Sequence, residues 1–263
     1  MVTRRLFTIE EAAQYLNVSK TTLRRWTKLG TIPCSRVGKK GERRFFQKDL
    51  DACLNVDETQ ARLMFAGDPA NPLAVLANAA TEGIPRHVCL HFNGRDELWR
   101  LFRPYVLEHL RLRAPILYIH EEDARDEVLS RIRAEGYDPE ELTHAGLLRL
   151  LVPADAYLRN DTFVPERMID FMEAAILEFR AFGHETVLVS GEMSWYLKGT
   201  PGAERMIEYE CLLNKLLARH PHVTVVCHYD LDRLNGAVTL GALCSHPHVQ
   251  IADRLVAGYY MVV

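Results

Sequence analysis

The sequence predicts an α/β protein in which a small winged helix-turn-helix domain precedes a larger, mainly parallel α/β sandwich. Two helical patterns and a hairpin pattern fill residues 8–46, and from about residue 87 short apolar runs alternate with helical patterns. Charge divides at nearly the same place. Residues 1–54 carry 12 Lys and Arg against 5 Asp and Glu, a net +7, whereas the remainder carries 20 against 30, a net −10.

The first helix is predicted from a capping box, in which the Thr8 hydroxyl caps the helix and Glu11 reaches back. The apolar residues of its buried face are Ile9, Ala12, Ala13 and Leu16. Ser19 can cap a second helix that ends at Gly30, a left-handed C-cap. Two helices separated by about three residues, the second rich in Lys, Arg and Thr, predict a helix-turn-helix.

A wing follows these helices. Residues 32–37 and 43–46 form the arms of a hairpin, and residues 38–41 form its tip. A short helix over residues 48–54 closes the domain, which we place at residues 1–54. Residues 55–84 are turn-rich and predict a linker. The second domain is then expected over residues 85–263.

The second domain is predicted from alternating strands and helices. The expected strands are 87–92, 115–120, 147–152, 186–191, 223–229, 249–252 and 255–262. The expected helices are 95–112, 123–135, 165–182, 202–219 and 231–245. This alternation indicates a mainly parallel sheet covered by helices on both faces.

Bulk properties exclude several classes of protein. Hydrophobic residues make up 48% and charged residues 25%, as in ordinary globular domains. We find no apolar run of about 18 residues, which argues against a membrane-spanning helix. The six cysteines are scattered and include no CxxC pair. We therefore expect a cytoplasmic protein in a reducing compartment.

The N-terminal segment resembles the excisionase/MerR-type winged helix-turn-helix family. The residues that carry this resemblance are Phe7–Ala13, Val18–Trp26, Gly30–Pro33 and Gly41–Phe45. The resemblance implies double-stranded DNA as partner. On the recognition helix and wing, the expected DNA-binding residues are Ser19, Lys20, Thr21, Thr22, Arg24, Arg25, Lys39, Lys40, Arg43 and Arg44.

Residues 85–252 resemble the MEDS sensory domain of regulators from methanogens and methylotrophs. The resemblance rests on His87–Leu90, Tyr157–Leu158, Phe163–Met168, Gly191–Trp195, Tyr209–Glu210, Leu213–Asn214, Cys227–Asp230 and His246–Val249. It implies a sensor with a RecA/KaiC-like core. A DNA-binding transcriptional regulator that senses a small ligand, which can be organic, is thus the expected function.

The ligand is expected at the carboxyl ends of the parallel strands, where ligands of such folds collect. The candidate ligand-binding residues are His91, Tyr118, His120, Tyr157, Glu192, Trp195, His228 and Tyr229. The first strand leads into Asn93–Glu97, which lacks the glycine-rich run and the lysine of a P-loop. We therefore expect no ATP hydrolysis, and the cofactor stays unidentified.

Other functions remain open for the second domain. Cys/His pairs such as Cys89 with His91 and Cys227 with His228 suggest a metal or redox sensor. The two thiols are more simply buried hydrophobes, so no metal is expected. Glu192 and Asp230 could be an acid and base, but no catalytic fingerprint supports an enzyme. An oligomerisation scaffold is the last alternative, and a homo-oligomer, a dimer or higher, is expected in any case.

Overall fold

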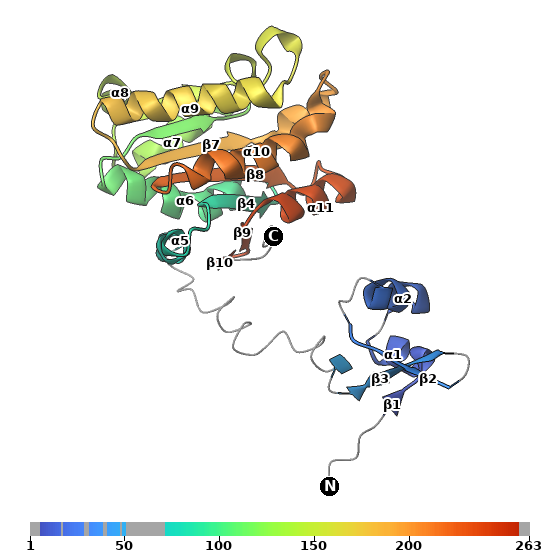
Figure 1. Ribbon diagram of the computed structural model, residues 1–263. Helices are drawn as coiled ribbons and strands as arrows, with labels where there is room; N and C mark the ends of the chain where they lie inside the picture. Colours follow the sequence, from blue (N-terminus) through green and yellow to red (C-terminus); the bar gives the residue numbers. More distant parts are fainter. Residues whose placement is uncertain are drawn as a thin grey trace. The chain divides into compact units, whose positions relative to one another are not determined.

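The computed structural model describes residues 6–16, 18–28, 32–38, 41–47, 49–50 and 72–257. The chain divides into two compact units, Met1–Ala66 and Gly67–Val263, and each is described by itself (Figure 1). Within the described residues, no helix is long and apolar enough to cross a membrane.

The smaller unit contains the predicted helix-turn-helix. Its described elements are β1 (Leu6–Phe7), α1 (Ile9–Tyr15), α2 (Lys20–Lys28), β2 (Ser35–Val37) and β3 (Glu42–Phe46). The capping box is confirmed, because the Glu11 amide donates to Thr8 Oγ1 at 3.2 Å and the Thr8 amide donates to Glu11 Oε2 at 2.8 Å. This reciprocal bonding fixes where α1 begins.

The wing is a hairpin in a three-stranded antiparallel sheet of order β1-β3-β2. Arg36 pairs with Arg43 across the hairpin, and Gly38 and Gly41 have positive φ at the tip. A small apolar core joins the sheet to both helices. Its buried residues are Phe7, Ala12, Ala13, Leu23, Ile32, Phe45 and Leu50. The predicted winged helix-turn-helix is therefore present.

The larger unit is the predicted α/β domain. Its strands are β4 (His87–Phe92), β5 (Ile116–Ile119), β6 (Leu148–Leu151), β7 (Val187–Glu192), β8 (Val223–Asp230), β9 (His248–Ile251) and β10 (Arg254–Ala257). Its α-helices are α5 (Pro72–Thr81), α6 (Arg95–Arg111), α7 (Arg125–Ala134), α8 (Pro139–His144), α9 (Pro165–Ala181), α10 (Met206–Ala218) and α11 (Gly236–Ser245). Short 3-10 turns are η1 (Pro153–Asp155), η2 (Arg159–Asp161), η3 (Met193–Lys198) and η4 (Ala203–Arg205).

The seven strands form one sheet of order β10-β9-β4-β8-β7-β5-β6. Every neighbouring pair is parallel except β9 with β10. The central strands β4, β7 and β8 are buried on both faces, which explains their apolar, β-branched sequences. The predicted mainly parallel sheet is confirmed.

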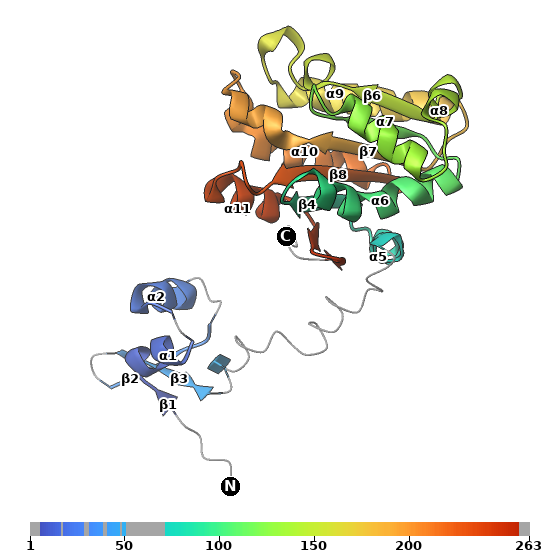
Figure 2. The same ribbon diagram turned by 180° about the vertical axis from the view of Figure 1, so that it is seen from behind.

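Helices cover both faces of this sheet. Helices α5 to α8 pack on one face and α9 to α11 on the other, as Figures 1 and 2 show from opposite sides. Because side chains alternate along a strand, each strand contributes to both cores. Val226 of β8 packs with Leu90 and Phe102 on the α6 face, whereas Val225 and Cys227 pack on the α10 face.

Two helices were not predicted from the sequence. Helix α5 lies in the segment expected to be a linker, but its Leu76 is fully buried in the α6-face core. Helix α8 has six residues, too few for a helical period, although Asp138 caps it and Pro139 follows. The predicted last strand is present from Arg254 to Ala257, and residues 258–262 of that prediction lie outside the described residues.

Candidate functional site

The recognition helix α2 exposes polar and basic side chains at its N-terminal end. The Thr22 amide donates to Ser19 Oγ at 3.0 Å, and the two hydroxyls lie 2.8 Å apart, so Ser19 and Thr22 cap the helix. Lys20 forms an exposed ion pair with Glu10 at 3.3 Å. Thr21 and Arg24 are exposed, whereas Leu23 is buried in the core. This face can approach a DNA groove without exposing the apolar core.

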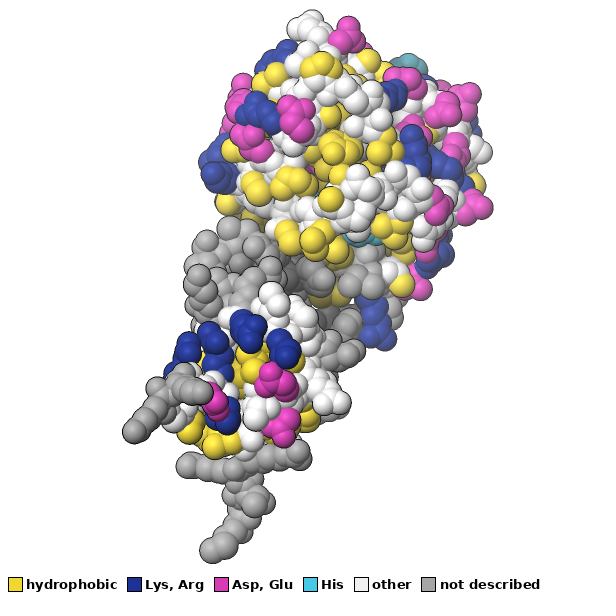
Figure 3. Space-filling view, turned by 90° about the vertical axis from the view of Figure 1, so that its right-hand side faces the viewer, with side chains coloured by type: hydrophobic (Ala, Val, Ile, Leu, Met, Phe, Trp, Pro, Cys, Tyr) yellow, Lys and Arg dark blue, Asp and Glu magenta, His cyan; other side chains and the backbone are white. Residues whose placement is uncertain are grey.

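The wing adds arginines to the same small domain. Arg44 donates to Glu42 at 2.8 Å and to the carbonyl of Arg43, and Arg36 donates to the carbonyl of Gly41. Figure 3 shows Lys and Arg side chains gathered on one side of this domain. The predicted contacts of Lys39, Lys40 and the Arg25 side chain lie outside the described residues.

The sheet separates the eight candidate ligand-binding residues into two sets. Tyr118, His120, Glu192 and His228 lie on the α6 face. His91, Tyr157, Trp195 and Tyr229 belong to the α10 side. The eight residues therefore do not line one pocket: of His91, His228 and Tyr229, only His228 lies on the same face as Glu192. The pleat explains this outcome, since neighbouring residues of β8 point to opposite faces.

Glu192 lies at the carboxyl end of β7 and is the centre of the first set. Its side chain is 3% exposed. Tyr118 donates to Glu192 Oε1 at 2.6 Å, and Arg95 from the first turn of α6 donates to Oε2. Arg95 also donates to Glu127 of α7 at 2.8 Å. Arg95 is not among the residues predicted from the sequence, although its position after β4 places it at this edge of the sheet.

The protonation behaviour of this network follows from burial and pairing. Burial raises the pKa of Glu192, while Arg95 and Tyr118 oppose that change. Burial would lower the pKa of Arg95, but the Glu192 carboxylate raises it instead. His228 donates to or accepts from Ser190 Oγ at 2.9 Å, and burial lowers its pKa to about 3. His228 is thus neutral beside an ion pair.

A narrow crevice adjoins this network, with an internal volume of about 10 Å³, room for about one water molecule. Its lining residues are Arg95, Leu98, Trp99, Phe102, Tyr118, Glu127, Val128 and Arg131. An apolar wall with a few placed polar groups is the usual composition of a small-molecule site. Its polar lining residues are Arg95, Tyr118, Glu127 and Arg131, and the first two hydrogen-bond to Glu192 behind them.

The other four candidates lie away from this crevice, and two of them line separate hollows, Tyr157 one of about 260 Å³ and Trp195 one of about 330 Å³. Trp195 is fully buried, and its ring stacks on Tyr157 at 5.0 Å and contacts Phe163 at 4.5 Å. Tyr229 donates to Glu210 Oε1 at 2.6 Å, and its ring lies 5.7 Å from that of His91. Burial lowers the pKa of His91 to about 4. These aromatic side chains fill the core between the sheet and helices α9 and α10.

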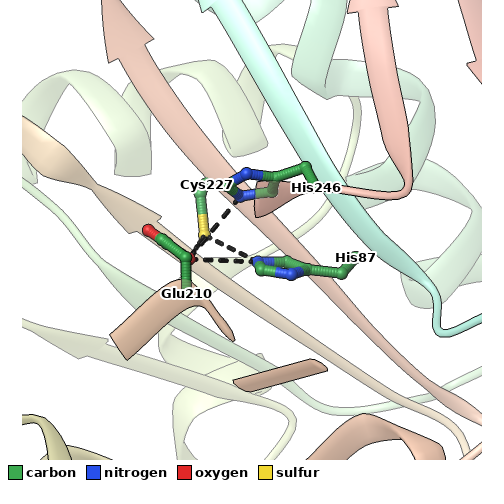
Figure 4. Close-up of side chains that lie close together, drawn as sticks. All are labelled: His87, Glu210, Cys227 and His246. Atoms are coloured by element: carbon green, nitrogen blue, oxygen red, sulfur yellow. Dashed lines mark hydrogen bonds and ion pairs between the residues drawn. The ribbon is translucent and has the colours of Figure 1, made fainter. Parts of the chain in front are cut away.

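A second polar cluster lies on the α10 face and consists of His87, Glu210, Cys227 and His246. All four side chains are buried, and their ligand atoms lie within 4.8 Å of one another (Figure 4). The sequence analysis named Cys227 as a candidate metal-ligand type but not Glu210. All four residues are among those that carry the MEDS resemblance, but nothing in the sequence groups them, because only the fold brings α10 against β4 and β8.

Burial dominates the titration of this cluster. It raises the pKa of the Cys227 thiol, as do the nearby Glu210 and Cys89. Burial and the neighbouring His87 lower the pKa of His246 to about 3. Burial would raise the pKa of Glu210, but His246, His87 and Tyr229 lower it overall. A carboxylate facing neutral imidazole is the resulting arrangement.

Comparison with known proteins agrees with both domains. Residues 86–247 match the model of the MEDS family, described as MEthanogen/methylotroph, DcmR Sensory domain. Residues 6–55 match the model of a helix-turn-helix domain. Both matches were expected from the sequence motifs.

Two known proteins show how far the similarity extends. The chain is 27% identical over 245 residues to the transcriptional repressor DcmR of Methylorubrum extorquens strain DSM 6343 / CIP 106787 / DM4, covering 92% of this chain and 89% of that protein. A solved structure of a KaiC-like protein from Pyrococcus horikoshii OT3 superposes with a TM-score of 0.43 and 12% identity, over 64% of this chain and 69% of that one.

The two family matches join a DNA-binding module to a sensory domain in one polypeptide, so the chain is a DNA-binding transcriptional regulator. The MEDS match covers more than half of the chain. The protein therefore belongs to the MEDS family, with an N-terminal helix-turn-helix domain.

Proposed function

We propose that this protein is a transcriptional repressor that releases DNA when a small organic molecule enters the crevice beside Glu192. The observation that carries the proposal is the hydrogen-bonded Arg95–Glu192–Tyr118 network, in which Glu192 is buried and Arg95 and Tyr118 line a small crevice of mixed apolar and charged side chains. The relative DcmR is a repressor by name, which supports the direction of regulation. The protein is proposed to sense its ligand without converting it and to act in the cytoplasm.

The small size of the crevice suggests how binding changes the protein. With room for about one water molecule, it can admit an organic ligand only if α6 and α7 move apart. Such a ligand binds the open state better than the closed state and therefore shifts the population toward it. Arg95 joins both helices, because it lies on α6 and donates to Glu127 on α7. We infer that its ion pairs rearrange when the ligand binds.

The ligand test uses the full chain and a DNA fragment that the protein selects from a random library. DNA affinity is measured by fluorescence anisotropy, at fixed salt, against one- and two-carbon alcohols, amines and halides. At least one compound should weaken DNA binding, and mass analysis after incubation should recover it unchanged. A chemically converted compound would contradict the sensing role and favour catalysis.

A matched pair of variants on α7 locates the site. Val128→Phe fills the crevice, whereas Ile132→Phe places the same ring one turn later, at a buried position that does not line it. Both can cost about 1–3 kcal/mol of stability through overpacking. Only Val128→Phe should abolish the response to the compound. Equal responses in the two variants would place the site elsewhere.

The DNA contacts are proposed at residue level. Arg24 on α2 is expected to read a base edge, so Arg24→Ala should weaken specific binding by about 1–3 kcal/mol and relax specificity at one position. Arg43 on the wing is expected to contact phosphate. Arg43→Ala should therefore weaken binding to all DNA sequences alike and make the DNA affinity less dependent on salt concentration. Lys215→Ala on α10 of the larger domain is the control. Unchanged binding by both arginine variants would overturn the assignment.

A homodimer is proposed for the active form, since one small winged domain buries too little DNA for high specificity. Sedimentation equilibrium of the full chain tests this state. A dimer should also select an operator with two half-sites spaced by whole helical turns. A monomer that binds a single half-site would contradict it.

A further inference from the structure

The cluster of His87, Glu210, Cys227 and His246 is independent of the crevice, because it lies on the opposite face of the sheet. Its members come from four separate elements. His87 begins β4, Cys227 is on β8, Glu210 is on α10, and His246 follows the last residue of α11. Figure 4 shows the four side chains converging on one point.

Four of the six distances between the converging atoms are close to those of a tetrahedral metal site, and all six are within 4.8 Å. His87 Nε2 lies 3.2 Å from Glu210 Oε2 and 3.4 Å from Cys227 Sγ. Glu210 Oε2 lies 3.6 Å from both Cys227 Sγ and His246 Nε2. Zinc bonds of about 2.0 Å to nitrogen or oxygen and about 2.3 Å to sulfur would place tetrahedral ligand atoms about 3.3–3.5 Å apart.

The hydrogen-bond pattern leaves these atoms as electron-pair donors. His246 Nδ1 lies 2.7 Å from the carbonyl of Ala242, which can only accept, so Nδ1 carries the proton. Its Nε2 is then a lone pair, buried and without a hydrogen-bond partner among the described residues. His87 Nδ1 lies 2.9 Å from Asn214 Oδ1, and Asn214 Nδ2 donates to the carbonyl of Ser245. In a neutral ring this contact places the proton on Nδ1, so His87 Nε2 is also a lone pair.

Only the Cys227 S–H proton is available to these atoms when both imidazoles are neutral. It can satisfy His87 Nε2 or Glu210 Oε2, but not both. The remaining lone pairs face one another in a dry interior, which is costly for buried polar groups. A divalent cation bound to the thiolate would satisfy all four atoms together.

Outer hydrogen bonds hold each ligand in place, as they do in metalloproteins. Asn214 orients the His87 ring and the Ala242 carbonyl orients the His246 ring. Tyr229 donates to the second oxygen of Glu210 at 2.6 Å and leaves Oε2 directed at the cluster. These contacts leave one lone-pair atom from each residue directed at the common centre.

We propose that His87, Glu210, Cys227 and His246 bind one divalent transition-metal ion of the zinc class. Two imidazoles, a thiolate and a carboxylate form a closed, four-coordinate site of the kind that stabilises structure. The ion would join β4 and β8 to α10 and to the α11–β9 junction. This proposal goes beyond ligand sensing, and its outcome does not depend on the crevice at Glu192.

The test measures metal in the full chain after chelation, dialysis and incubation with Zn²⁺ alone. Elemental analysis should find one Zn²⁺ per chain, and zinc should raise the melting temperature. Substituted Co²⁺ should give the intense visible spectrum of a tetrahedral site with a thiolate charge-transfer band. A chain that retains no Zn²⁺ and gives only the faint spectrum of hydrated Co²⁺ would overturn the proposal.

Matched variants identify the ligands. Cys227→Ser and His246→Gln should lose the metal, whereas Cys89→Ser and His248→Gln, at buried neighbouring positions outside the cluster, should keep it. Tyr229→Phe, which retains the ring, should lower Zn²⁺ affinity by about 10- to 100-fold. Retention of metal by folded Cys227→Ser, or equal affinity in Tyr229→Phe, would contradict this ligand set. If the ligand variants do not fold, the Co²⁺ spectrum of the wild-type chain decides the outcome.

Discussion

The two faces of the central sheet each contain a buried glutamate, and the two differ in how they are paired. Glu192 on the α6 face receives hydrogen bonds from Arg95 and Tyr118. Glu210 on the α10 face has one such hydroxyl donor, Tyr229, and otherwise faces two imidazoles and a thiol. A buried charge needs a partner of opposite charge or several donors. Glu192 is paired with a permanent cation, Arg95, whereas the groups that face Glu210 include a cation only if an imidazole is protonated or a metal ion is bound.

The largest expected change in stability comes from removing Arg95, the counter-ion of Glu192. Arg95→Met leaves a buried carboxylate unpaired and should lower the free energy of unfolding by about 3 kcal/mol, at the low end for buried pairs because Arg95 is partly exposed. Urea denaturation measures this. Arg103, on the same helix as Arg95, forms a more exposed pair with Glu135 at the end of α7, so Arg103→Met should cost less than about 1 kcal/mol. An equal decrease in the free energy of unfolding for Arg95→Met and Arg103→Met would mean that Glu192 is solvated rather than buried.

A matched tyrosine pair distinguishes the two faces directly. Tyr118→Phe and Tyr229→Phe each remove a hydroxyl that donates to a buried carboxylate, and each should cost about 2 kcal/mol. The decrease in the free energy of unfolding caused by Tyr118→Phe should be the same in the presence of Zn²⁺ and in the presence of a chelator. The decrease caused by Tyr229→Phe should be larger in the presence of Zn²⁺, because the Tyr229 hydroxyl also orients Glu210, a proposed metal ligand. Identical zinc dependence in the two variants would remove the distinction between the faces.

The pH dependence of stability tests the environment of Glu192. Because burial raises its folded pKa above 4.5, its contribution is fully present below pH 4.5 and decreases as pH rises through the folded value. The unfolded state releases the proton first, so the slope is negative and at most about 1.4 kcal/mol per pH unit. Glu192→Gln should remove this slope in parallel denaturation curves. A difference between the two proteins that does not change with pH would contradict the raised pKa.

The smallest expected effect is that of added nucleotides, because we predict that the protein does not bind them. Glu97 of α6 accepts from the Asn93 amide at 2.9 Å, and Asp96 lies beside it in the first turn. These carboxylates lie where a P-loop would bind phosphate, and they would repel it. Calorimetry with MgATP should give no heat of binding. Saturable binding in the micromolar range would show that the α6 face is a nucleotide site.

Local patterns were enough to predict most elements of the fold. The Thr8–Glu11 capping box, the wing glycines and the apolar strand runs act through contacts within a few residues, so they are readable from the chain. Helix α8 was not predicted, because its six residues are too few to show a helical repeat of apolar residues. Helix α5 was mistaken for a linker because its turn-rich surroundings gave no sign that Leu76 would be buried.

The candidate sites depended on longer-range information. The carboxyl ends of the strands were correctly expected to carry polar side chains, and Glu192 is one of them. The sequence could not decide which face each side chain occupies, because one residue of register reverses the face. Nor could it pair Arg95 with Glu192, since these residues are 97 positions apart.

The amino-acid sequence by itself determined the two-domain organisation, the helix-turn-helix with its wing, and the alternation that gives a mainly parallel sheet. These follow from capping, periodicity and charge, which act locally. Tertiary structure alone decided that Glu192 meets Arg95 and that Glu210 meets His87, Cys227 and His246. Parallel strands are joined by long crossovers, so residues that share a site come from distant segments, and only the packed sheet and helices bring them together.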